Sequence, residues 1–92
     1  MDELYHRVTE CVEQIKAVNN RLARRDLLRM LRTVDSALNE LDSERVECRR
    51  LNRNTARYQQ LESRALELIV NLEQHLTLAR LMFIWPINVL VL

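Results

Sequence analysis

The sequence predicts an all-α protein, either a coiled-coil helical hairpin or a three-helix bundle, that ends in a non-helical apolar C-terminal tail. Two observations carry this prediction. The 92 residues include no glycine and a single proline, Pro86, so residues 1–85 contain neither strong helix breaker. Apolar residues also recur at alternating spacings of three and four, as in the a and d positions of a heptad. A composition of 48% apolar and 29% charged residues is typical of globular or coiled-coil chains, not of disorder.

The first helix is expected over residues 2–22. Its apolar residues are spaced 4-3-4-3-4, and they are Leu4, Val8, Cys11, Ile15, Val18 and Leu22. Asp2 and Glu3 lie in the first turn, where negative charge complements the helix dipole. Glu3 and Arg7 form an i,i+4 pair of the favourable orientation.

A turn or kink is expected within residues 19–26, because the apolar seam fails at Arg25. Asn19 and Asn20 suit the end of a helix, and Asp26 is a good N-cap for a second helix that starts at Leu27. The second seam has spacings of 4-3-4-3 and consists of Leu27, Leu31, Val34, Leu38 and Leu41.

The third seam has a phase that does not follow from the second, and it consists of Tyr58, Leu61, Ala65, Leu68 and Leu72, reaching His75 or Leu76. Two interpretations are open. Residues 27–85 form one long helix with a three-residue stammer, or the chain turns at 50–55 and a new helix restarts with Asn54 or Thr55 as its cap. The second arrangement closes a bundle that resembles a spectrin repeat in outline.

Residues 1–80 are expected to form a single helical domain and residues 81–92 an apolar tail, and Pro86 is expected to end the third helix. This tail is too short to span a membrane. Three roles are open for it. In the first role, the tail enters a membrane interface through Phe83, Ile84 and Trp85. In the second, it docks on a partner protein. In the third, it is an alternative end of a longer helical protein.

Charge is distributed in bands, although the net charge is only +1. Residues 21–32 carry five arginines and one aspartate, residues 33–44 carry four acids and no base, and residues 45–57 carry five arginines and one glutamate. On a continuous helix one stripe would be formed by Arg45, Arg49, Arg53 and Arg57. Such a stripe indicates an anionic partner, or else arginines that pair locally with the acidic band of an antiparallel hairpin. Nucleic acid is the less favoured partner because no aromatic residue except Tyr58 lies nearby.

No constellation of residues points to catalysis, a cofactor or a metal. His6 and His75 belong to different expected helices, and the glycine-dependent phosphate loops are excluded. Cys11 and Cys48 lie on seams as buried thiols, which suits a reducing compartment. The first ten residues lack the features of a secretory signal. We therefore expect an intracellular protein, cytoplasmic or nuclear, that is not an enzyme and has no small-molecule substrate.

The expected function is that of a scaffold or assembly subunit, which binds partner helices through its Leu/Val seams as a homo- or hetero-oligomer in a multi-protein complex. The alternative is a peripheral membrane protein that uses the apolar tail and the arginine stripe.

Overall fold

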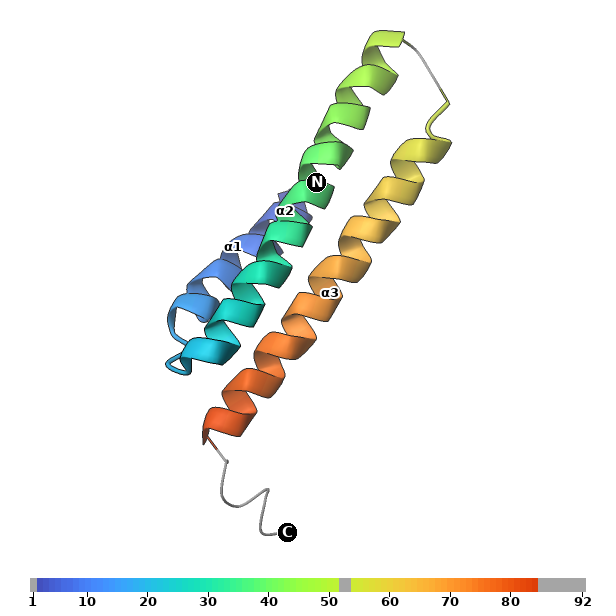
Figure 1. Ribbon diagram of the computed structural model, residues 1–92. Coiled ribbons are helices and arrows are strands. Elements are labelled where there is room, and N and C mark those ends of the chain that lie inside the picture. Colours follow the sequence, from blue (N-terminus) through green and yellow to red (C-terminus); the bar gives the residue numbers. More distant parts are fainter. Residues whose placement is uncertain (1, 52–53, 85–92) are drawn as a thin grey trace.

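The computed structural model describes residues 2–51 and 54–84, which form three helices. They are α1 (Asp2–Lys16), α2 (Arg21–Leu51) and α3 (Ala56–Ile84). Helices α2 and α3 make a long antiparallel hairpin, and α1 lies along one half of it (Figure 1). The all-α prediction is confirmed. The single helix over 27–85 is wrong, because α2 ends at Leu51 and α3 starts at Ala56.

Asn20 starts α2, in place of the predicted cap Asp26. The side-chain Oδ1 of Asn20 accepts a hydrogen bond from the backbone N–H of Ala23 at 3.0 Å, as an N-cap does. Its carbonyl accepts the bond from Arg24 N at 2.9 Å. The predicted start at Leu27 is therefore wrong. Asn and Asp are equally good N-caps. A helix that starts at Arg21 instead of Leu27 has six more residues with helical backbone hydrogen bonding.

The connection between α2 and α3 is made by the Asn and Thr residues that the sequence singled out. Asn54 Oδ1 accepts a hydrogen bond from Ala56 N at 2.7 Å, and the Thr55 carbonyl accepts one from Gln59 N at 2.9 Å. The expected helix restart at Asn54 or Thr55 is confirmed. The phase shift between the second and third seams follows from this turn and is not a stammer.

The core forms where one apolar seam from each helix meets the other two. Its buried members are Leu4, Val8, Cys11, Ile15, Val18, Leu27, Val34, Ala37, Leu38, Leu41, Ala65, Ile69, Leu72 and Leu76. Ala37 and Ile69 were not predicted. Leu22 was predicted to extend the first seam, but it is 72% exposed. Because α1 ends at Lys16, Leu22 belongs to the first turn of α2 instead.

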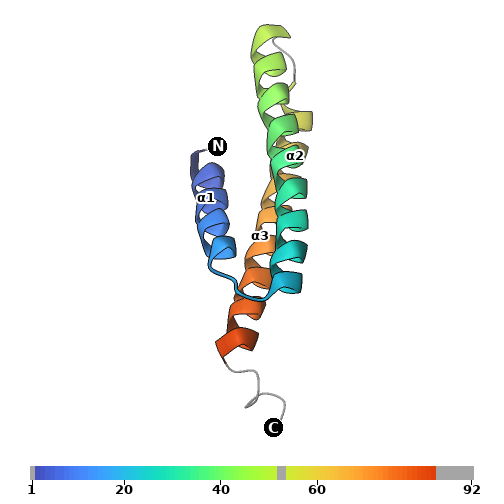
Figure 2. The same cartoon turned by 60° about the vertical axis from the view of Figure 1, so that its left-hand side comes forward.

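Burial is uneven along the hairpin. Within the described residues, the buried positions of α2 lie between Leu27 and Leu41, and those of α3 between Ala65 and Leu76. Residues 42–51 and 54–64, here called the distal stem, contain no buried residue. Helix α1 has 15 residues against 31 in α2, and it leaves the distal stem two helices thick (Figure 2).

The C-terminal part of α3 differs from the prediction. The tail assigned to residues 81–92 was expected to be non-helical, but α3 continues through Ile84, two residues before Pro86, the residue expected to end this helix. Helical hydrogen bonding can continue to this point because the single proline of the sequence is Pro86. The side chains of Phe83 and Ile84, and all of Trp85, lie outside the part that the structure describes. In that part, no helix combines the length and apolar character needed to cross a bilayer.

Candidate interaction surfaces

The seams predicted to bind partner helices face one another inside the chain. Eleven of those residues are buried, and they are Leu4, Val8, Cys11, Ile15, Val18, Leu27, Val34, Leu38, Leu41, Ala65 and Leu72. Four more are partly buried against the same core: Leu31, Tyr58, Leu61 and Leu68. In this conformation the seams hold the chain's own helices together, and binding of a partner helix through them stays a prediction.

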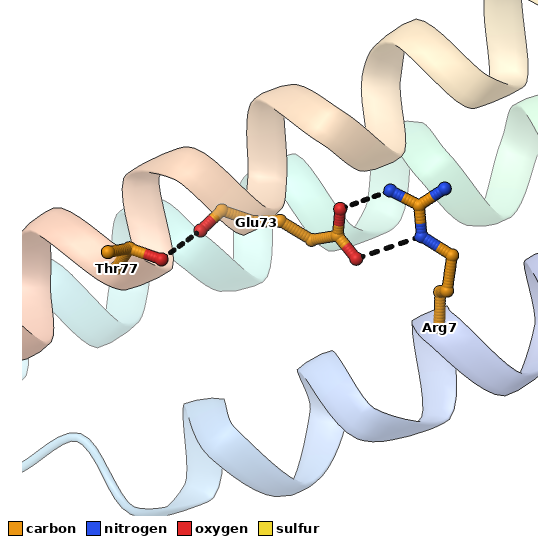
Figure 3. Close-up of polar contacts among 3 residues, drawn as sticks. All are labelled: Arg7, Glu73 and Thr77. Atoms are coloured by element: carbon orange, nitrogen blue, oxygen red, sulfur yellow. Dashed lines mark hydrogen bonds and ion pairs between the residues drawn. The ribbon is translucent and has the colours of Figure 1, made fainter.

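A bidentate ion pair between Arg7 and Glu73 joins α1 to α3 (Figure 3). Arg7 Nε donates to Glu73 Oε2 at 3.0 Å, and a second guanidinium nitrogen donates to Glu73 Oε1. The hydrogen bond to Glu73 raises the pKa of Arg7 above its ordinary value. Thr77 Oγ1 donates to the backbone carbonyl of Glu73 at 3.0 Å. Sequence spacing pointed Arg7 toward Glu3 of its own helix and missed this pair, because 66 residues separate its members.

The two cysteines are not joined by a disulfide. Cys11 is buried in the core, and this burial, more than nearby charges, raises the pKa of its thiol. Cys48 is only partly buried in the distal stem, where its Sγ lies 3.5 Å from Glu44 Oε1 and 3.8 Å from the Asn54 carbonyl. Cys11 therefore fits the prediction of a buried thiol better than Cys48 does.

The predicted arginine stripe is divided by the turn between α2 and α3. Arg45 lies on α2 and contacts Asp42 at 2.8 Å, whereas Arg57 lies on α3 and reaches back to Glu44 of α2 at 3.6 Å. Arg49 is exposed, and Arg53 lies outside the described residues. Because the stripe needed one continuous helix, that part of the prediction is wrong. Arg45 and Arg57 instead pair with the acidic band, and binding to an anionic partner stays a prediction.

The distal stem exposes apolar side chains and holds one buried polar atom that lacks a partner among the described residues. Val46 is 52% exposed and Leu51 is 49% exposed, while Tyr58 is half-buried. At the seam, the Nε of Arg45 is buried and has no hydrogen-bond acceptor among the described residues. A buried donor without an acceptor destabilises the folded state. This part of the hairpin is therefore less well packed than the part that α1 covers.

Both histidines lie on exposed helix surfaces in the described part of the chain. His6 Nε2 lies 3.2 Å from Glu10 Oε1 on the surface of α1. His75 is exposed, with Nδ1 at 2.8 Å from the Asn71 carbonyl, and Leu76 takes the seam position. The described residues contain no group of three or more His, Cys, Asp or Glu that could hold a metal ion.

Comparisons of the chain with protein-family models, with curated proteins and with solved structures found no match.

Proposed function

We propose that the protein is a non-enzymatic assembly subunit, and that its distal stem binds a helix of another protein. One observation carries this proposal: α1 covers only half of the hairpin that it packs on (Figure 2). The covered half has a three-helix core, whereas the distal stem has no buried residue in its described part.

A third helix would supply what the distal stem lacks. Most of the stability of a helix in a protein comes from packing of its apolar face, and a pair of helices buries less of that face than a trio does. The described residues of the stem extend over 42–51 of α2, a length of about 15 Å at 1.5 Å per residue. A partner helix of about three turns would therefore cover it, placed end to end with α1.

The face that such a helix would contact follows from the spacing on α3. Glu73 marks the side of α3 that α1 contacts, and Leu66 lies seven residues earlier on the same face. Leu66, which lies two residues beyond the distal stem, is 40% exposed. Val46 and the half-buried Tyr58 add apolar surface nearby on the stem. A partner helix with an apolar stripe and a carboxylate or carbonyl acceptor for Arg45 fits this surface.

The test compares three versions of the full chain, each produced in cells and purified together with the proteins bound to it. The stem variant is Val46→Ser, within the distal stem, with Leu66→Ser, just beyond it. The matched control is Leu78→Ser with Leu81→Ser on the exposed proximal part of α3. We expect wild type and control to recover the same proteins in fixed stoichiometry, and the stem variant to lose them about tenfold or more. All three should have the same helix content by circular dichroism.

Equal recovery by all three versions would contradict the proposal. A second contradicting result is a monomer, by sedimentation, whose sharp melt does not depend on concentration and whose distal-stem amides are as protected as those of the core.

The alternative role at a membrane rested on the tail and on the stripe. No observation on the described residues favours it, since the turn divides the stripe and residues 85–92 lie outside them.

A further inference from the structure

A second surface lies at the other end of α2, on its first three turns. Its arginines, here called the basic patch, are Arg21, Arg24, Arg25, Arg29 and Arg32. Arg24 is partly buried and the other four are exposed. None of the five forms an ion pair with any residue in the described part of the chain. The arginines of the distal stem differ, since Arg45, Arg50 and Arg57 each contact a carboxylate.

The basic patch is unfavourable for the isolated chain. Arg21, Arg25 and Arg29 follow one another at i,i+4, where like charges on a helix repel. Asp26 is the one acid within residues 21–32, so the patch keeps a charge of +4. An anionic partner would remove this repulsion and would satisfy guanidinium groups whose planar donors match carboxylates.

Two leucines among these arginines restrict the kind of anionic partner. Leu22 is 72% exposed and Leu28 is 39% exposed. Together with four of the arginines they line a shallow hollow of about 300 Å³, formed by Arg21, Leu22, Arg24, Arg25, Leu28 and Arg32. A partner that fills this hollow must present apolar side chains between negative charges.

We infer that the basic patch is a docking surface for an acidic amphipathic helix of another protein. Such a helix offers carboxylates to the arginines and apolar side chains to Leu22 and Leu28. A nucleic-acid backbone has no apolar surface for the leucines, and the patch carries no aromatic residue for base stacking. Insertion into a bilayer needs a broad apolar face, and this face has two leucines among five arginines.

A second copy of this chain is a poorer occupant. Its acidic band is partly used within the chain, because Asp42 contacts Arg45 and Glu44 contacts Arg57. The inferred surface is separate from the one in the proposed function, since residues 33–41 of α2 lie between the basic patch and the distal stem.

The experiment measures fluorescence anisotropy of a labelled synthetic helix of about three heptads, with leucine at a and d positions and glutamate beside them. The full chain is compared with Arg25→Glu/Arg32→Glu and with a control of identical charge change, Arg49→Glu/Arg64→Glu. We expect saturable binding that weakens with salt, a loss of about tenfold or more in the patch variant, and a change within about twofold in the control. A peptide with serine in place of leucine should bind about tenfold more weakly.

Four results would overturn the inference. They are an absence of saturable binding, equal binding by the patch variant, equal binding of the serine peptide, and tighter binding to phosphatidylserine vesicles or duplex DNA than to the peptide. Unchanged helix content of each variant by circular dichroism shows that a loss of binding does not come from unfolding. Stem variants that lose partners in the earlier experiment should bind this peptide normally, so the two proposals fail separately.

Discussion

The contact between Arg7 and Glu73 joins α1 to α3 through two hydrogen bonds. A guanidinium that donates two hydrogen bonds to one carboxylate fixes both distance and direction, which packing of aliphatic side chains does less strictly. Both side chains keep contact with water, with exposures of 27% and 35%. Solvent therefore weakens the pair, and its main effect is on the register of α1 along α3.

A double-mutant cycle measures this contact. We expect Arg7→Met and Glu73→Gln, tested singly and together by urea unfolding, to give a coupling free energy of about 1 kcal/mol. Arg64→Met is the control, because Arg64 is exposed and has no ion pair with the described residues. A coupling indistinguishable from zero would mean that packing alone places α1.

The Cys11 thiol makes stability depend on alkaline pH. Because burial raises its pKa in the folded state, the folded chain keeps the thiol proton after the unfolded chain has lost it. Stability is then complete below the ordinary thiol pKa of about 8.5 and falls as pH rises above it. We expect the urea midpoint of wild type to fall more between about pH 8 and 9.5 than that of Cys11→Ala. Parallel pH profiles for the two proteins would refute this.

At the scale of single helices, periodicity predicted the apolar faces better than the helix ends. The seams of α1 and α2 are buried almost as predicted, because spacing alone decides which residues share a helix face. The start of α2 was misplaced because Asn20 and Asp26 are both good caps, and local preference does not choose between them. Ile69 was missed because α3 is apolar on more than one side, which gives its sequence two competing faces.

Substitution at the two candidate caps distinguishes them. Asn20→Ala removes the acceptor for Ala23 N and should lower the free energy of unfolding by about 1 kcal/mol. Asp26→Ala, inside α2, should change it by less than about 0.5 kcal/mol. Thermal unfolding followed by circular dichroism measures both. A larger loss at Asp26 than at Asn20 would place the start of α2 where the sequence first suggested.

At the scale of the whole molecule, the sequence could not tell which surfaces are internal. The heptad pattern predicts that Leu38 and Leu72 pack against a neighbouring helix, but it does not predict whether that helix belongs to the same chain. Helix α1 has 15 residues and leaves the distal stem uncovered. The charge bands were visible in the sequence. The pair between Arg57 and Glu44 depends on the antiparallel fold, whereas Arg45 pairs with Asp42 of its own helix.

Hydrogen exchange should reveal the difference between the two halves of the hairpin. We expect amides of residues 42–51 and 56–64 to exchange through local opening that costs at least about 1 kcal/mol less than opening of residues 30–41 and 65–76. The reason is that in the described chain only the second set includes buried side chains. Mass spectrometry or NMR measures the rates. Uniform protection along α2 and α3 would contradict an uneven core.

Because α1 is about half as long as α2, the length of the hairpin beyond α1 can change without altering the three-helix core. Every described buried side chain of α2 and α3 lies between Leu27 and Leu41 or between Ala65 and Leu76. Insertion or deletion of one heptad in each arm beyond those limits leaves the three-helix packing in register. Each such step moves the Asn54–Thr55 connection about 10 Å along the long axis. The molecule thus has an anchored base and an arm whose length evolution, or a protein engineer, can change without redesigning the base.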